Sequence, residues 1–380
     1  MKNLTLIFFV FISSFLNSQT INENAVKKHL YTLANDSMQG RKAGSPGIEK
    51  AAKYIEQQFS EIGLKPFNSS SFRQSFKHIN SRSESKEELD LFNIIGLLEG
   101  TSLKEEFVVI SAHYDHLGQK KDSTGDFIYN GANDNATGVS AMIMLAEYFK
   151  KNKTNKRSIL FVAFTAEEMG LIGSNYFGKT ISAESIIAGV NIEMIGKESP
   201  FGPKTAWLTG FERSSFGRII QKNLSNSEYK LYPDPYENFR LFFRSDNASL
   251  ARLGVPAHTF STSPMDKDLD YHQLSDEVET LEVKIGDLLL GNHHPIRIQT
   301  MTTTDTMDTI GTVEQSIRCI EAGAELVRIT APSKNEALNL QNIKDELRKR
   351  GYNTPLVADI HFTPNAAEIA ARIIEKVRVN

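Results

Sequence analysis

The sequence contains a single cysteine, Cys319, among its 380 residues. An internal disulfide needs two cysteines, and a zinc or iron-sulfur site built from thiolates needs several, so the chain can form neither by itself. Any bound metal must therefore be held by histidine and carboxylate side chains.

The chain also lacks a strong excess of charge of either sign. Its 43 Lys and Arg residues against 46 Asp and Glu residues leave a formal net charge of -3. It has no basic stripe with interleaved aromatic residues, so nucleic acid is not expected as a partner. A hydrophobic content of 40% is ordinary for a soluble globular protein, and the length allows two domains.

Long hydrophobic runs are scarce as well. An apolar run over residues 4–16 follows Lys2, and small and polar residues that include Ser18 come after it. The run is shorter than the roughly 20 residues that span a bilayer, and a buried first helix is the less favoured alternative. We predict a signal peptide over residues 1–18, cleaved near Ser18, and a secreted or periplasmic protein without a membrane anchor after cleavage.

Apolar runs typical of buried strands alternate with amphipathic helical patterns through residues 19–281. Strands are predicted over 92–98, 107–112, 158–164 and 186–192, and helices over 48–62 and 136–149. This alternation predicts an α/β fold with a mostly parallel sheet, helices on both faces, and ligands at the carboxyl ends of the strands.

Metal-binding side chains follow these and similar runs. They are His113 in HYDHLG, Asp134 in GANDNATG, Glu167 and Glu168 in TAEEMG, Glu193 in NIEMIG and His272 in DYHQLSD. Two neighbouring zinc ions need imidazoles, terminal carboxylates and one shared carboxylate, delivered from separate elements to one point. We predict that each run is a strand ending at its ligand and that the set holds two Zn²⁺ ions for peptide hydrolysis.

Each motif has a simpler explanation when it is taken alone. His113 could be a buried histidine satisfied by Asp115, and Asp134 could cap a helix. Glu167 and Glu168 could be a solvated acidic pair. The order of all the motifs along the chain favours the metal site, in which Asp115 would hold the second ring nitrogen of His113.

Charge balance separates the roles of the carboxylates. Asp134, Glu168 and Glu193 together with a hydroxide neutralise two divalent ions. Glu167 then remains free to take a proton from water and pass it to the leaving amine, so we predict that it is the general base.

Residues from about 25 to 278 resemble the di-zinc exopeptidase family, which includes secreted leucyl aminopeptidases, glutamate carboxypeptidase II, the transferrin receptor and glutaminyl cyclases. Besides the ligand motifs, the resemblance rests on SMQGRKAGSPGIEKAAKYI, FNIIGLLEG, RSILFVAFTAEEMGLIGS and ARLGVPAHTF. It implies a first zinc held by His113, Asp134 and Glu193, a second held by Asp134, Glu168 and His272, and Glu167 as general base.

Two positions depart from that family's pattern. Glu193 stands where Asp is more usual, and Asn247 replaces a His often found after Ser-Asp. Ser245 and Asp246 are still expected to line the substrate pocket. The resemblance implies an aminopeptidase acting on a peptide substrate; a one-zinc glutaminyl cyclase and a non-catalytic binding module are the alternatives.

Residues 282–380 show a second repeat of strand and helix. Strands are predicted over 296–299, 326–329 and 356–358 and from Val377, and helices around 312–321, 335–350 and 364–374. The period of about 30 residues is that of βαβ units. Three units and a fourth strand are too few for an eight-stranded barrel, so an incomplete (β/α) barrel is expected.

The motifs VKIGDLLLGNHHPIRIQTMTTTDTMDT, AGAELVRIT and PLVADIHFTPNAAEIAARIIEKVRVN resemble the N-terminal part of hydroxymethylbutenyl diphosphate synthase, an isoprenoid enzyme. The resemblance places Arg328 and Arg378 near substrate phosphates, although they could be ordinary surface arginines, and the segment lacks that family's cluster cysteines. We hypothesise a fusion of two truncated reading frames. The first supplies a signal peptide (1–18) and an exopeptidase domain (19–281) without its final helix, and the second supplies a non-functional barrel fragment (282–380). Without that helix, the loop of His272 is expected to be held loosely.

Overall fold

The computed structural model describes residues 22–80, 86–120, 126–281, 283–285, 288–290, 297–361 and 363–379. The predicted signal peptide over residues 1–18 lies outside these ranges. Within them, no helix is both long enough and apolar enough to cross a membrane.

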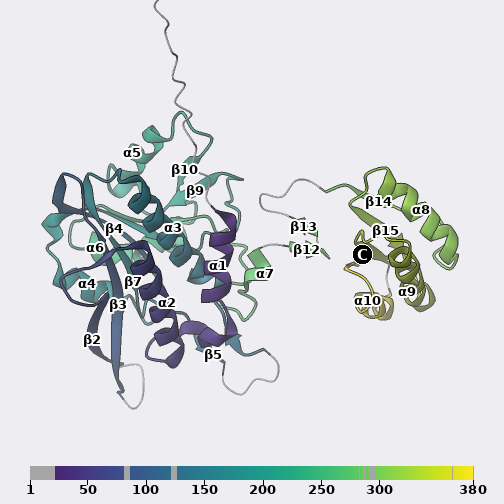
Figure 1. The fold of residues 1–380 in the computed structure, drawn as a ribbon, viewed down its shortest axis with the longest axis horizontal. Coiled ribbons are helices and arrows are strands. Elements are labelled where there is room, and N and C mark those ends of the chain that lie inside the picture. The colour runs from purple at the N-terminus through teal and green to yellow at the C-terminus, as the bar shows by residue number, and fades with distance from the viewer. Residues whose placement is uncertain are drawn as a thin grey trace, which may run out of the picture.

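A sheet with the strand order β1-β3-β7-β4-β8-β11-β9-β10 organises residues 22–281, and β2 pairs with β3 (Figure 1). Its strands are β1 (Lys65–Pro66), β2 (Arg73–Ile79), β3 (Glu88–Leu98), β4 (Leu103–His113), β7 (Arg157–Phe164), β8 (Ile186–Ile192), β9 (Thr205–Leu208), β10 (Lys230–Pro233) and β11 (Ala257–Ser261). The central strands β7, β4, β8 and β11 run parallel, whereas β3 and β9 pair with their neighbours β7 and β11 in the antiparallel sense. The predicted parallel centre is confirmed, and antiparallel strands flank it.

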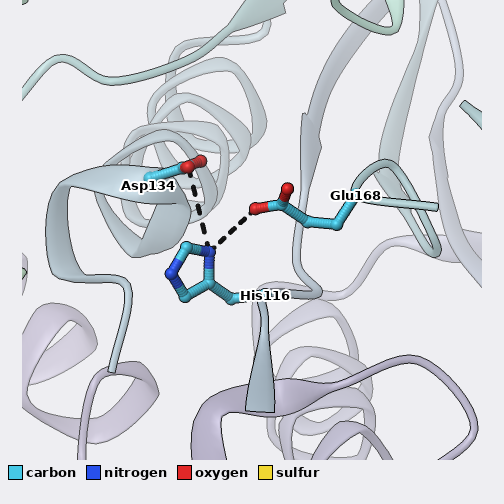
Figure 2. A group of neighbouring side chains, drawn as sticks. All are labelled: His116, Asp134 and Glu168. Carbon is cyan, nitrogen blue, oxygen red and sulfur yellow. Dashed lines mark hydrogen bonds and ion pairs between the residues drawn. The ribbon is translucent and has the colours of Figure 1, made fainter. Parts of the chain in front are cut away.

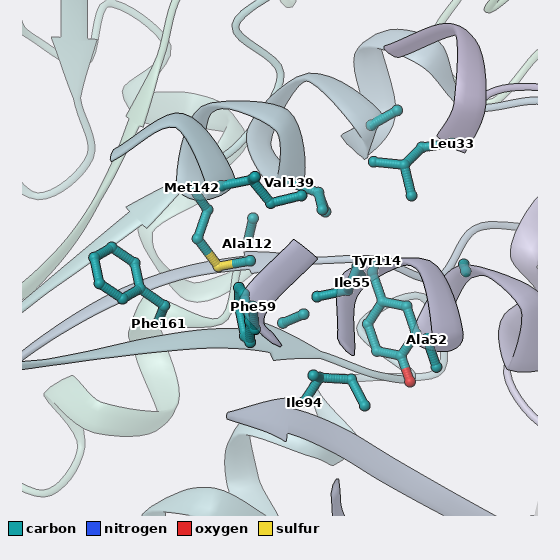
Figure 3. Close-up of a cluster of buried hydrophobic side chains, with 14 of the residues drawn as sticks. Leu33, Ala52, Ile55, Phe59, Ile94, Ala112, Tyr114, Val139, Met142 and Phe161 are labelled. Atoms are coloured by element: carbon teal, nitrogen blue, oxygen red, sulfur yellow. The ribbon is translucent and has the colours of Figure 1, made fainter. Parts of the chain in front are cut away.

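Helices cover both faces of this sheet, as predicted. One face carries α1 (Glu23–Leu33), α2 (Pro46–Ile62) and α3 (Thr137–Asn152), and the other carries α4 (Ile172–Thr180) and α6 (Asn247–Ala251). On the first face, Phe59 and Met142 pack against Phe161 of the sheet, and all three are fully buried (Figure 3). Burying side chains of this size stabilises the fold by about 1.5–3 kcal/mol each, which fixes the strand ends firmly.

Residues 297–379 form a separate four-stranded parallel sheet in the order β14-β15-β16-β17. Its elements are β14 (Gln299–Met301), α8 (Thr309–Glu321), β15 (Leu326–Thr330), α9 (Lys334–Lys349), β16 (Leu356–Ile360), α10 (Pro364–Ala371) and β17 (Lys376–Val379). Between the two sheets lie α7 (Val278–Leu281) and the hairpin of β12 (Val283–Ile285) and β13 (Leu288–Leu290). The predicted barrel-type repeat is confirmed, with the first strand shifted by a few residues and the last helix ending earlier.

Candidate metal centre

Three neighbouring parallel strands deliver candidate ligands to one edge of the large sheet. β4 ends at His113, β8 is followed directly by Glu193, and the turn after β7 carries Glu167 and Glu168. Because β7, β4 and β8 are adjacent and parallel, their carboxyl ends meet at this edge. The structure therefore agrees with the predicted placement of these residues at strand ends.

Asp134 and His272 come from loops, so the prediction that every candidate ligand ends a strand is wrong for these two. Asp134 lies in the turn Ala132–Ala136 that leads into α3, and its peptide bond to Asn135 is cis. His272 lies in the long loop between β11 and α7. A loop can reach over the strand ends, which a further strand in the plane of the sheet could not do.

The carboxylate of Asp134 lies between two imidazoles. Its Oδ1 is 3.1 Å from Nε2 of His113, and its Oδ2 is 3.2 Å from Nε2 of His272. The same nitrogen of His272 is 3.2 Å from Oε2 of Glu168. Asp134 thus offers one oxygen to each histidine, which is the arrangement expected of a carboxylate shared between two sites.

His116 also belongs to this centre, and the sequence analysis missed it. Its Nδ1 lies 2.9 Å from Oε1 of Glu168 and 3.8 Å from Oδ2 of Asp134 (Figure 2). These three residues form a group whose donor atoms are close enough together to hold one ion. The signal was present in the sequence, because His116 is the second histidine of the HYDHLG motif.

Asp115 has a different contact from the predicted one. Its side chain accepts hydrogen bonds from the backbone N–H groups of Glu167 and Glu168, at 3.0 and 3.3 Å. The Nδ1 atom of His113 is 3.1 Å from the main-chain oxygen of Asp115 and 3.9 Å from its carboxylate. Asp115 therefore holds the turn that carries the acidic pair, and its backbone rather than its side chain contacts the imidazole.

Glu193 lines the same cavity, and its carboxylate contacts the side chains of Ser245 and Asn191. It accepts a hydrogen bond from the Ser245 hydroxyl, and Nδ2 of Asn191 lies 3.3 Å from its Oε2. Burial raises the pKa of the Glu193 carboxyl, and nearby Asp134 adds to the rise. Ser245 lines the cavity as predicted and positions this carboxylate.

Asp246 lies behind the centre and does not line the cavity. Its side chain is buried, and neither carboxylate oxygen has a hydrogen-bond partner among the residues that the structure describes. Burial raises the pKa of Asp246 to about 7. The prediction that this residue would line the substrate pocket is therefore wrong, because its side chain packs inward from the start of α6.

Arg41 is a buried cation that ties the ligand loops together. Its guanidinium donates hydrogen bonds to the main-chain oxygens of Leu33 (2.6 Å), Tyr114 (3.0 Å), Asn130 (2.6 Å) and Gly131 (2.9 Å). Tyr114 follows the end of β4, and Asn130 and Gly131 precede the turn that carries Asp134. Because hydrogen bonds from a charged donor are strong, these four bonds fix the loops relative to each other.

Asp276 links the turn of Asp134 to the loop of His272. Its carboxylate accepts hydrogen bonds from the backbone N–H groups of Asn133 (2.8 Å) and Asp134 (3.0 Å). Its own main-chain oxygen accepts a third bond, from the N–H of Ala132 at 3.0 Å. The two loops that supply ligands from outside the sheet are therefore bound directly to each other.

Lys197 anchors the loop of His272 from the other side. Its Nζ forms ion pairs with Asp268 and with Asp270, the second at 2.7 Å, and both acids lie just before His272. Lys197 itself follows β8, four residues after Glu193. The expectation that this loop is held loosely is therefore wrong, because two ion pairs and the bonds of Asp276 fix it.

The charges of the centre shift one another's protonation. Burial raises the pKa of the Glu167 carboxyl well above its usual range, and neighbouring Glu193 and Asp246 add to this rise. For His272, burial acts to lower the pKa, but hydrogen bonds to Asp134 and Glu168 outweigh it and raise the pKa to about 10. Neighbouring carboxylates thus act in the same direction on both groups, because negative charge nearby favours the protonated form of each.

A cavity of about 370 Å³ opens onto the centre. The charged part of its lining consists of Asp134, Glu167, Glu168, Glu193 and His272, with Arg244 in addition. The apolar and aromatic part includes Leu171, Met194, Trp207, Leu241, Phe243 and Met265. Reactive side chains that converge on a cavity with both polar and apolar lining are typical of a substrate site.

Arg328 and Arg378 lie in the other sheet and take no part in this centre. Arg378 Nη1 is 3.1 Å from Oδ1 of Asp359, and Arg328 Nε is 3.5 Å from Oδ2 of the same residue. Their placement near phosphates of a substrate stays a prediction. In the structure, both arginines neutralise one aspartate at the carboxyl ends of β15, β16 and β17.

Two family profiles match the chain. The profile of Peptidase family M28 matches residues 93–287, which is just over half of the 380 residues. The profile of the GcpE TIM-barrel domain matches residues 280–380. The two matches overlap between residues 280 and 287, close to the boundary that we predict at 281.

Solved structures of similar fold match the first part of the chain. An aminopeptidase from Aneurinibacillus sp. strain AM-1 is 16% identical, with a TM-score of 0.51 over 68% of this chain and 89% of that one. BSAP, a zinc aminopeptidase from Bacillus subtilis, is 14% identical, with a TM-score of 0.54 over 68% and 90%. Porphyromonas gingivalis glutaminyl cyclase is 16% identical, with a TM-score of 0.52 over 68% and 91%. At these identities the likeness shows the fold alone.

Curated relatives match the last part. The 4-hydroxy-3-methylbut-2-en-1-yl diphosphate synthase (flavodoxin) of Phocaeicola vulgatus is 56% identical over 102 residues, which are 27% of this chain and 17% of the relative. The protein of the same description from Leptospira interrogans is 51% identical over 102 residues, 27% of this chain and 15% of the relative. The chain therefore spans about a sixth of the length of these relatives.

Proposed function

Because the chain belongs to peptidase family M28, we propose that residues 22–281 form a zinc-dependent exopeptidase, most simply an aminopeptidase that acts on peptides. The observation that carries this proposal is the position of Asp134 between His113 and His272, with Glu168 beside His272. Nitrogen and carboxylate oxygen donors of this kind are those that zinc binds in proteins that offer no thiolates.

The spacing of the donor atoms is close to, and slightly shorter than, the spacing that such ions need. A tetrahedral zinc site with bonds of about 2.0–2.2 Å has edges of about 3.3–3.6 Å between ligand atoms. The pairs His113–Asp134, Asp134–His272 and His272–Glu168 are separated by 3.1, 3.2 and 3.2 Å. In addition, Nε2 of His113 is buried and has no hydrogen-bond partner in the part of the chain that the structure describes. An orphaned imidazole nitrogen that faces a carboxylate is best satisfied by a cation.

We assign two zinc positions to these donors. His113, Asp134 and Glu193 would hold one ion, and Asp134, Glu168 and His272 would hold the other. When bound, zinc would polarise a substrate carbonyl and lower the pKa of water. The buried excess of carboxylates in this centre, which is unfavourable without cations, supports a site for two divalent ions.

Glu167 is the group that we assign to proton transfer. It lines the cavity beside Glu168, but no ion pair joins it to the histidines of the centre among the described residues. Its raised pKa lets the carboxylate accept a proton from water and release it to the departing amine at neutral pH. Asp115 supports this role because it binds the backbone N–H of Glu167 and thereby sets the direction of the side chain.

The predicted signal peptide adds a location to this proposal. We propose that the enzyme is exported and acts on peptides outside the cytoplasm, because an apolar run that is too short to span a bilayer is typical of a cleaved leader. The single cysteine, Cys319, is compatible with export because a chain without disulfides does not depend on an oxidising compartment.

A glutaminyl cyclase with one zinc is the second candidate. The group of His116, Asp134 and Glu168 supports it, because their donor atoms suffice for one ion without His113 or Glu193. The two candidates therefore differ in the number of ions bound and in the reaction.

The test uses the full chain, stripped of metal by a chelator and then supplied with zinc. Bound zinc per chain would be measured by mass spectrometry, and the products of Leu-p-nitroanilide and of a peptide with N-terminal Gln would be followed. Two zinc ions and release of nitroaniline are expected for the aminopeptidase. One zinc ion and a cyclised glutaminyl peptide would instead support the cyclase, and failure to bind zinc would contradict both.

A further inference from the structure

Three arginines near the cavity have no acidic partner. Among the residues that the structure describes, the guanidiniums of Arg213, Arg240 and Arg244 make no ion pair and no side-chain hydrogen bond, whereas other arginines of the same region do. Arg73 pairs with Glu49 and Glu56, Arg157 pairs with Glu106, and Arg218 pairs with Glu212.

Two of these arginines lie over one aromatic ring, that of Phe243, and the third, Arg244, is the next residue in the sequence. The guanidinium carbon of Arg213 lies 4.7 Å from the ring centre of Phe243, and that of Arg240 lies 5.9 Å from it. Arg213 is also 4.7 Å from the ring of Phe242. Stacking on a ring holds a guanidinium in place while leaving its N–H donors free. The cluster is therefore positioned without being neutralised.

The cluster lies at the opening of the cavity. Phe243 and Arg244 both line the cavity and are both exposed to solvent, with Phe243 at 41%. The cavity thus has carboxylates around the metal centre and guanidiniums at its edge.

We propose that Arg213, Arg240 and Arg244 select substrates that carry a carboxylate near the bond to be cleaved. The inference rests on the peptidase function proposed above and names its substrate class. Free guanidiniums bind carboxylates through paired N–H donors, and a cavity edge that is partly shielded from water strengthens the attraction. The carboxylate comes either from the C-terminus of a short peptide or from an acidic side chain in the second residue.

The test compares substrates that differ only in this charge. With the zinc-loaded full chain, kcat/KM is measured for Leu-Gly against Leu-Gly amide, and for Leu-Glu amide against Leu-Gln amide. Leu-p-nitroanilide serves as a neutral reference. We expect the charged member of at least one pair to be favoured by about five- to tenfold, and the preference to fall in 0.5 M NaCl because salt screens exposed charges. The first pair reports a terminal carboxylate and the second an acidic side chain.

Replacement of the three arginines gives the decisive comparison. In the triple variant R213Q/R240Q/R244Q, the ratio within each pair is expected to fall to about one, while kcat/KM for Leu-p-nitroanilide stays within about twofold. Lysine at the same three positions should restore part of the ratio because it restores the charge. R218Q is the matched control, since Arg218 is exposed but paired with Glu212. Ratios of one in the native chain, or equal losses on all substrates in the triple variant, would overturn the proposal.

Calorimetry separates this inference from the peptidase assignment. Binding of Leu-Gly and of Leu-Gly amide is measured on the zinc-loaded chain carrying Glu167→Gln. Tighter binding of the free acid by this variant, together with no cleavage of any substrate by the native zinc-loaded chain, would support the role of the three arginines and refute the peptidase. Equal binding of both peptides by this variant and equal cleavage of both by the native chain would support the peptidase and refute the role of the three arginines.

Discussion

The two sheets of this chain each place charged side chains at the carboxyl ends of parallel strands, but they balance those charges differently. In residues 22–281, the carboxylates of Asp134 and Glu168 face imidazoles, and the nearby cation Arg41 binds main-chain oxygens instead. In residues 297–379, the single buried Asp359 is met by Arg328, Arg378 and His361.

The difference shows what distinguishes a reactive centre from a stabilising cluster. Buried charge is costly unless opposite charge compensates it. Asp359 has its compensation within the chain, so it needs no ion. The centre around Asp134 has more carboxylates than imidazoles to compensate them, which favours the binding of divalent cations. Charged side chains at strand ends therefore form a candidate reactive centre in one sheet and a stabilising cluster in the other.

The largest effect is expected from Glu167→Gln, which tests whether the centre around Asp134 is the reactive one. The neutral amide cannot take up a proton, so kcat should fall by about 10²–10⁴-fold, the usual contribution of general acid-base catalysis. Zinc content should stay unchanged, because Glu167 is not among the proposed ligands. Turnover of Leu-p-nitroanilide and zinc per chain are the measurements, and full activity in the variant would remove Glu167 from the mechanism.

A second test asks whether the two sheets are stabilised independently. Leu340 is fully buried in the core of the second sheet. Leu340→Ala should destabilise that region by about 2–5 kcal/mol. If the regions unfold separately, a denaturant curve should show only one of two transitions shifted, with peptidase activity and zinc binding retained. Equal loss of both transitions would show that the first region depends on the second.

A smaller effect is expected when the loop of His272 loses its anchor. Lys197→Met keeps most of the side-chain volume but removes the ion pairs with Asp268 and Asp270. Residues that orient metal ligands typically contribute 10- to 100-fold to affinity, and we expect a loss of about tenfold for one zinc only. Competition with a zinc-binding dye would measure both affinities, and K204M, which removes an exposed pair with Glu228, is the control.

The smallest effect is predicted for Asp359→Asn in the second sheet. The variant removes the charge that Arg328 and Arg378 neutralise, but both arginines are partly exposed and can be solvated. We expect a loss of about 1–2 kcal/mol of stability in that region alone. Thermal unfolding would measure it, while zinc content and peptidase activity should not change. A change in either would contradict the separation of the two clusters.

Most of the fold could be predicted from local pattern. The helix Pro46–Ile62 begins after Ser45 and ends at Gly63, whose φ of 78° favours glycine, and both signals are visible in the sequence. The buried strands β4, β7 and β8 appear as apolar runs. The short strands β1, β9 and β10 were not predicted, because strands of two to four residues carry too little periodicity.

The ligand types of the candidate centre could also be predicted, but the residues that contact and position these ligands could not. His113, Asp134 and His272 stand in recognisable motifs. Asp276, in contrast, binds the backbone of Asp134 from 142 residues away, and nothing in either segment alone indicates this contact. The contact of His116 with Glu168 is of the same kind, since it joins two strand ends.

The sequence by itself determined that any metal must be bound through imidazole and carboxylate, because Cys319 is its single thiol. It also determined the order of strands and helices, since side-chain periodicity is a local property. Only the tertiary structure decided which oxygen of Asp134 faces which histidine, that Asp246 is buried without lining the cavity, and that Arg213 and Arg240 share the ring of Phe243. The physical reason is that these contacts depend on how loops from distant segments pack over the sheet, and packing is a property of the whole fold.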